Sequence, residues 1–256
     1  ELYFYYNNIS NSFNNKLIKE IDNLVNFNII LFNSIHNNPR KNIKIYFPIT
    51  NFKKTIDINK NNQLVADNIN TGYTRFFSND YDNYIVIYRY EEIKKVLIHE
   101  LIHLYNFHLR YDVSNFKINN LIKNNNNNFS IYETYTEVYA TIIYTFYYSK
   151  LNNLDFNELF NKQILFSNLQ AAKVLYSQNI YNLINTQNII INEDTNAICY
   201  YILKSCMLNN LNKFKILFNK NNGFLLDTKQ RVNQFEDILI KSFNKNFKNN
   251  INKNLL

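Results

Sequence analysis

Residues 91–109 read EEIKKVLIHELIHLYNFHL, and the interpretation of the whole chain starts from this stretch. Its apolar residues recur at the three- and four-residue intervals that make one side of an α-helix apolar. They are Ile93, Val96, Leu97, Leu101, Ile102, Leu104 and Tyr105. The spacing therefore predicts a helix over about residues 91–109.

Within this predicted helix, residues 99–103 read His-Glu-Leu-Ile-His. At about 100° per residue, His99 and His103 lie roughly 40° apart around the helix and one turn apart along it, so both imidazoles can reach one metal ion. Glu100 projects from the neighbouring face, where a carboxylate can accept a proton from metal-bound water without occupying a coordination position. The pentapeptide predicts two zinc ligands and a general base.

A hydrolytic zinc site usually has three protein ligands and one position for water, so a third donor is needed. Glu133 and Glu137 are the best candidates, because they lie four residues apart on a helix predicted over residues 130–148 and share one face. We expect Glu133 to bind the metal and Glu137 to accept the N–H of a ligating imidazole, with Glu137 as the alternative ligand. Ser130-x-x-Glu133 and Thr134-x-x-Glu137 also match helix-capping boxes, which need no metal.

The other two histidines of the chain are not expected to bind this metal. His108 follows His103 by five residues, which turns it about 140° away from that ligand on a continuous helix. His36 lies near the end of an earlier predicted helix, and it has no predicted role.

The remaining periodicity predicts a mixed first part and a mainly helical second part. Before the pentapeptide we expect a helix at 13–32 and short strands at 43–47, 54–58, 74–77 and 84–88. After the glutamate helix we expect helices at 154–167, 168–185, 195–208, 211–218 and 229–246. The asparagine run at 124–128 is expected to be a surface loop.

These elements predict an α+β fold in two tightly joined parts. Residues 1–115 would form an N-terminal subdomain with a helix, a small mixed sheet and the histidine helix. Residues 116–256 would form a helical subdomain that includes the glutamate helix. The division follows the change from mixed to helical periodicity.

His99-Glu100-x-x-His103, followed by a glutamate on a second helix, resembles the gluzincin branch of zinc metallopeptidases, the thermolysin-like group in the broad sense. The resemblance covers residues 84–145, and the preceding helix and strands in outline. It implies a zincin-like fold and one Zn²⁺ per chain on His99, His103 and Glu133. It also implies that Glu137 is the acidic partner of a ligating histidine.

The same resemblance implies a strand beside the cleft that holds the peptide substrate in extended form. By that pattern the substrate-binding strand is residues 84–88, with Tyr84, Val86 and Tyr88. We therefore expect a peptide or protein as the partner of this site.

The sequence departs from the thermolysin-like pattern in one respect. Those enzymes use a later histidine to steady the oxyanion, whereas this chain has no histidine after His108. Arg231, Tyr200 and Tyr201 are the candidates for that role, and the sequence does not rank them.

Composition argues against a nucleic-acid partner. The formal net charge of +8 would ordinarily favour an anionic partner. However, Asn, Lys, Ile, Tyr and Phe dominate while there are only 2 glycines and 2 prolines, a usage typical of AT-rich coding DNA. No stretch clusters basic residues as a nucleic-acid patch would, so we do not expect nucleic-acid binding.

Cysteine usage and hydropathy bear on the compartment. Cys199 and Cys206 lie in a predicted helix at a spacing unlike a metal-binding pair, so we expect buried thiols, which slightly favours a reducing intracellular compartment. No apolar run reaches the about 18 residues needed to cross a membrane. The sequence begins at Glu1 rather than Met, which is compatible with a removed signal or pro-segment.

Together the motifs predict a zinc-dependent metallopeptidase, with an endopeptidase as the favoured form. Glu100 would activate the water that attacks the peptide bond. Two other functions stay open: a catalytically inactive zinc-binding interaction module of the same fold, and a basic helical protein associated with nucleic acid.

Overall fold

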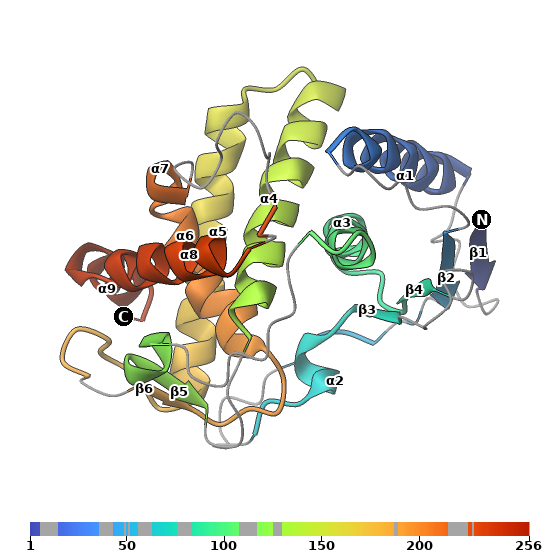
Figure 1. Cartoon of the computed structure of the whole chain (residues 1–256). Coiled ribbons are helices and arrows are strands. Elements are labelled where there is room, and N and C mark those ends of the chain that lie inside the picture. The colour runs from blue at the N-terminus through green and yellow to red at the C-terminus, as the bar shows by residue number, and fades with distance from the viewer. Residues whose placement is uncertain are drawn as a thin grey trace.

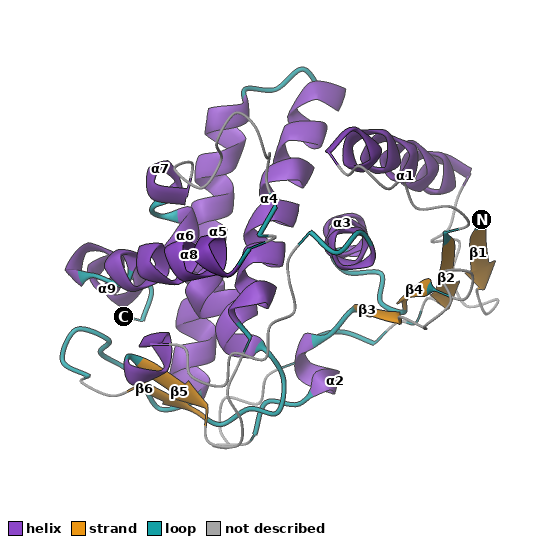
Figure 2. Ribbon diagram, in the orientation of Figure 1, coloured by secondary structure: helices purple, strands orange, loops and turns teal. Residues whose placement is uncertain are grey.

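The computed structural model describes residues 1–5, 15–35, 43–48, 50, 52–55, 63–75, 83–107, 117–124, 130–186, 189–214, 225–226 and 228–255 of the 256-residue chain. The first part contains β1 (Leu2–Tyr5), α1 (Asn15–Ile35), β2 (Lys44–Pro48), α2 (Ala66–Ile69), β3 (Gly72–Arg75), β4 (Tyr84–Ile87) and α3 (Ile93–Leu104) (Figure 1). The second part contains the 3-10 helix η1 (Lys117–Asn120), β5 (Ile122–Asn124), α4 (Ile131–Leu151), α5 (Phe156–Ser177), β6 (Ile189–Ile191), the π-helix η2 (Ile198–Leu203), α6 (Lys204–Leu208), α7 (Leu211–Phe214), α8 (Lys229–Ser242) and α9 (Lys245–Asn252). Helices predominate over a small sheet (Figure 2), which confirms the α+β class.

The larger sheet has the strand order β1-β2-β4-β3. β1, β2 and β4 run parallel, and β3 pairs antiparallel with β4 at one edge. Ile45, Phe47, Ile85 and Ile87 alternate with less buried residues and are fully buried. This period-two alternation is the signal that predicted strands at 43–47 and 84–88.

Other strands differ from the prediction. β3 begins at Gly72 rather than at residue 74, and residues 76–77 lie outside the described residues. The strand predicted at 54–58 is irregular at 54–55, and its remainder is also outside the described part. β1, β5 and β6 were not predicted, because short strands depend on distant partners such as Ile122 and Ile189, which pair in a second, parallel sheet.

α3 lies at the centre of the molecule, where α1, α4, β3 and β4 all pack against it (Figure 1). Because neighbours cover its faces, its polar residues His99, Glu100 and His103 are buried together with its apolar ones. The helix ends at Leu104, and Asn106 then adopts a left-handed conformation with φ 52°. The prediction that the helix continues to residue 109 is therefore wrong for residues 105–107. Residues 108 and 109 lie outside the described part.

The helices of the second part divide the chain differently from the prediction. The stretches predicted as 154–167 and 168–185 are largely the single helix α5, since Ser167 and Asn168 are buried in its middle rather than in a break. The stretch predicted as 229–246 is two helices, because Asn244 caps α9 by accepting a hydrogen bond from the Phe247 N–H. The stretch predicted as 195–208 is η2 followed by α6. Of the helix predicted at 211–218, residues beyond 214 are outside the described part.

One cluster of buried apolar residues runs from α1 and the larger sheet through α3 to the C-terminal helices. Cys199 and Cys206 are free thiols inside this core, as expected. Within the described stretches, no helix combines the length and the hydropathy needed to cross a bilayer.

We predict that Gly72→Ala destabilises the fold. A Cβ at Gly72 would lie 2.7 Å from the carbonyl oxygen of Val86 and 3.3 Å from Cγ1 of Val96, so either the β3–β4 pair or α3 would have to shift. The expected loss in the free energy of unfolding is about 1–3 kcal/mol, measured by urea denaturation. The control Tyr73→Phe, at an exposed position of the same strand, should stay within about 0.5 kcal/mol of the parent. Equal stability of the alanine variant would contradict this close packing.

Candidate metal centre

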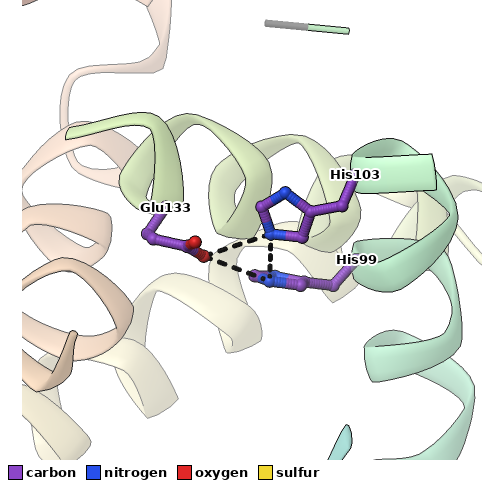
Figure 3. Close-up of side chains that lie close together, drawn as sticks. All are labelled: His99, His103 and Glu133. Carbon is purple, nitrogen blue, oxygen red and sulfur yellow. Dashed lines mark hydrogen bonds and ion pairs between the residues drawn. The ribbon is translucent and has the colours of Figure 1, made fainter. Parts of the chain in front are cut away.

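The three predicted ligands come together between α3 and α4 (Figure 3). His99 and His103 lie one turn apart on α3, and Glu133 lies in the first turn of α4. The side chain of Ser130 makes no capping hydrogen bond at the start of α4. The Glu133 carboxylate points at the two imidazoles instead, so the capping-box interpretation of Glu133 is wrong.

The ligand atoms form a nearly equilateral triangle. Nε2 of His103 is 2.9 Å from Nε2 of His99 and 3.2 Å from Oε2 of Glu133. Nε2 of His99 is 3.3 Å from the same carboxylate oxygen. Two ligands of a tetrahedral zinc, each about 2.0–2.1 Å from the ion, are about 3.3 Å apart. The donor types and their spacing therefore fit a single zinc ion.

Glu137 orients His99 from the other side of the ring. Its Oε1 lies 3.0 Å from Nδ1 of His99, an ion-pair distance, although the pair is not aligned as a good hydrogen bond. Its Oε2 accepts from Nζ of Lys95 at 3.0 Å and from Nζ of Lys204 at 3.2 Å. The carboxylate is thus anchored by α3 and α6, and it faces the histidine nitrogen that points away from the ligand triangle.

The charges of this cluster depend on one another. Burial lowers the pKa of His99, but contacts with the Glu133 and Glu137 carboxylates and the charges of Glu137 and Glu100 outweigh it and raise the pKa to about 10. Burial raises the pKa of Glu133, and the charge of His103 with hydrogen bonds from both histidines overcomes this and holds it well below its usual range. The pKa of Glu137 is also held low against burial, first by Lys95 and then by other neighbouring cations. A metal ion must therefore displace a proton to bind His99.

Glu100 lies beside the triangle, and its carboxylate is held by the larger sheet. The hydroxyl of Thr74, on β3, lies 2.8 Å from Oε2 of Glu100 and 3.0 Å from its carbonyl oxygen. Glu100 is only 6% exposed. This contact fixes a carboxylate next to the ligand atoms without making it one of them, which is the position required of a general base.

The strand predicted to bind substrate is not an edge strand, so that prediction is wrong. In β4, Tyr84 and Val86 pair with β2 on one side and with β3 on the other. Tyr88 donates its N–H to the Thr71 carbonyl and accepts from the Thr50 N–H. Since both sides of 84–88 are already paired, no peptide can add there.

The edge strands of the larger sheet are β1 and β3, and β3 is the one that contacts Glu100; among the described residues no strand pairs with its outer side. In an antiparallel pair, successive residues point their N–H and C=O groups alternately toward and away from the partner strand. Because Tyr88 bonds to Thr71 in this register, the backbone groups of Gly72 and Thr74 point away from β4. The outward backbone groups of β3 therefore include those of Thr74, whose side chain contacts Glu100.

The three candidates for the oxyanion donor differ in their position relative to His99. The ring of Tyr200, on η2, lies 5.8 Å from that of His99. Burial first, then the charges of Glu133 and Glu100, raise the pKa of Tyr200 well above its usual value, so its hydroxyl keeps its proton. Tyr201 lies on the same π-helical turn and stacks under Nζ of Lys204. Arg231 is on α8 and donates to the Leu225 carbonyl, away from the residues around His99.

A pocket beside the candidate metal centre has a cavity volume of about 40 Å³. His99, Glu100 and Glu137 form one wall. Lys54, Lys95, Lys204, Tyr200 and Tyr201 form much of the rest. Lys95 could have been suspected from the sequence because it precedes His99 by one helical turn, whereas Thr74 and Lys204 come close only through the tertiary fold. His36 and His108 lie outside the described residues.

We predict that zinc binding requires these ligands and releases protons. His103→Ala and Glu133→Ala should lose the one zinc per chain expected in the wild type, as measured by plasma mass spectrometry. Because metal-free His99 is protonated below about pH 10, zinc affinity should rise with pH by about tenfold per unit for each proton displaced. Competition with a chelator between pH 6 and 8 measures this slope.

The matched control is Glu158→Ala, an exposed glutamate on α5 that should keep its zinc. Zinc retained in both ligand variants, or an affinity that does not change with pH, would contradict the assigned ligand set.

The chain was compared with models of protein families, with curated proteins and with solved structures, and none of them matches it. Its function therefore has to be inferred from the residues themselves. The relevant geometry is the His99, His103 and Glu133 triangle with Glu100 beside it.

Proposed function

We propose that this protein is a zinc-dependent metallopeptidase of zincin-like fold, similar to the gluzincins. The observation that carries the proposal is the triangle of Nε2 of His99, Nε2 of His103 and Oε2 of Glu133, with edges of 2.9, 3.2 and 3.3 Å. Two neutral nitrogens and one carboxylate oxygen form a ligand set that leaves a position open for water in catalytic zinc sites.

Zinc held at these three atoms would lower the pKa of a coordinated water to about 7 and polarise a carbonyl group. Glu100 accepts the proton of the attacking water and passes it to the amine that leaves when the peptide bond breaks. Thr74 supports this role because its hydroxyl keeps the Glu100 carboxylate in one orientation. Glu137 keeps His99 turned so that Nε2 faces the ligand triangle.

The proposed substrate is an extended peptide lying along the free edge of β3. Peptides commonly bind by adding a strand to such an edge, because the main-chain hydrogen bonds do not depend on the side chains. The outward backbone groups of Gly72 and Thr74 would pair with the peptide on the side nearest Glu100. This edge replaces residues 84–88 in the proposed substrate site.

Tyr200 is the proposed oxyanion donor. Its ring packs beside His99, and its raised pKa keeps the hydroxyl protonated, so it can donate to a developing negative charge. Tyr201 contacts Lys204 instead.

The general-base role predicts the behaviour of Glu100→Gln. An amide cannot accept the proton, so the rate of peptide hydrolysis should fall by about 10²–10⁴-fold. Zinc content should remain one per chain, because Glu100 is not a ligand. The assay is cleavage of a broad library of unstructured peptides, with mass spectrometry of the products.

The control is Glu158→Gln, which should cleave at the parental rate. A Glu100→Gln protein with parental activity would refute the assigned base. A wild type that binds zinc and cleaves no peptide of the library would instead favour an inactive zinc-binding module.

The oxyanion role predicts a different defect for Tyr200→Phe. Removing the hydroxyl should lower kcat by about 10²–10³-fold and leave KM nearly unchanged, since the donor acts on charge that develops during the reaction. Steady-state kinetics on one peptide substrate measures both constants. Tyr176→Phe, at an exposed position of α5, is the control. A Tyr200→Phe variant with unchanged kcat would exclude this donor.

A further inference from the structure

The pocket beside the metal centre is lined by three lysines that share two carboxylates. Lys54 donates to Oε2 of Glu92 at 2.7 Å. Lys95 lies 3.3 Å from Oε1 of Glu92 and 3.0 Å from Oε2 of Glu137. Lys204 lies 3.2 Å from that same oxygen of Glu137.

The three ammonium groups contact only two carboxylates, Glu92 and Glu137, whereas Glu100, the third carboxylate of the pocket lining, accepts a hydrogen bond from Thr74. Lys95 and Lys204 approach one oxygen of Glu137, while its other oxygen is directed at His99. An ammonium group has three N–H donors, so one shared oxygen does not use the hydrogen-bonding capacity of two lysines. Burial first, and then the nearby charge of Lys95, lower the pKa of Lys204 although Glu137 and Glu92 act to raise it.

Anchoring Glu137 does not account for three lysines. One buried ammonium would be enough to balance and orient that carboxylate, and each further buried cation is costly unless an anion meets it. Lys204 is 7% exposed, and it lines the pocket beside His99 and Glu100. A ligand carboxylate in the pocket would give the three lysines a third anionic partner.

We propose that this pocket, with Lys54, Lys95 and Lys204, is a subsite for a carboxylate of the substrate next to the scissile bond. The position follows from Glu137, since one of its oxygens touches the lysines and the other faces the metal-binding His99. A substrate carboxylate at the lysines would therefore lie on the other side of Glu137 from His99 Nδ1. The carboxylate can belong to an Asp or Glu side chain or to the C-terminus of the peptide.

This inference rests on the proposed function, and it is tested by binding rather than by turnover. The zinc-loaded Glu100→Gln protein is titrated with capped hexapeptides that carry one Glu at successive positions, each paired with its Gln counterpart. The same peptides are used with a free or an amidated C-terminus, and the dissociation constants are measured by calorimetry.

A charged peptide is expected to bind about tenfold more tightly than its neutral counterpart, as a charge-assisted contact requires. If replacing Glu by Gln in the peptide weakens binding, the recognised group is a side-chain carboxylate. If amidation weakens binding, the recognised group is the C-terminus. Lys204→Gln in the same background should reduce the preference several-fold. Lys204→Arg should retain it, and so should the control Lys94→Gln, whose lysine pairs with Glu20 outside this pocket.

Equal affinity for charged and neutral peptides would overturn the subsite, whether or not the lysine variants fold. If the wild type still binds zinc and cleaves neutral peptides, the proposed function survives that result. Absence of zinc and of cleavage would instead overturn the proposed function, and the Glu and Gln peptides, titrated against the metal-free protein, would then decide the subsite by binding.

Discussion

The rest of this site depends on the contacts that the carboxylate of Glu137 makes. It lies between Nδ1 of His99 on one side and the ammonium groups of Lys95 and Lys204 on the other. These residues belong to α3, α4 and α6, so one buried anion ties together three helices that are distant in sequence. Removing it would leave two lysines and a histidine buried without their shared partner, which is costly in an apolar interior.

The burial of α3 explains why such a contact is needed. A helix covered by α1, α4 and the larger sheet would normally be apolar all round. Here three of its core positions are His99, Glu100 and His103. Each of them has a polar partner supplied by another element, including Glu133 from α4 and Thr74 from β3. The polar residues of α3 are therefore accommodated by the tertiary structure rather than by solvent.

The base and the lysines share one pocket. Glu100 contacts Thr74 of β3, and it lines the same pocket as Gly72, His99 and the three lysines. An extended substrate on β3 would thus meet a base at its reacting group and cations in the same pocket. The π-helical turn of η2 adds Tyr200 and Tyr201 to the same pocket, and π-helical turns are frequent at functional sites.

The sequence by itself determined the local structure and the chemical identity of the candidate site. The three-to-four-residue periodicity around residues 99–103 predicted the helix, and the spacing of His99 and His103 placed both imidazoles on one face, because these are properties of a single helix. The alternation in 43–47 and 84–88 predicted two strands for the same local reason. Glu133 was predicted as the third donor, and the structure places its carboxylate against both histidines.

Only the tertiary structure decided which edge strand lies beside Glu100 and which cations reach the site. Residues 84–88 have the same alternation whether they lie inside a sheet or at its edge, so strand order had to come from pairing between distant segments. Thr74, Lys204 and Tyr200 are ordinary residues in the sequence, and they become part of the site because packing around α3 brings their elements together. Local spacing specifies geometry within one element, whereas contacts between elements depend on how their buried faces pack.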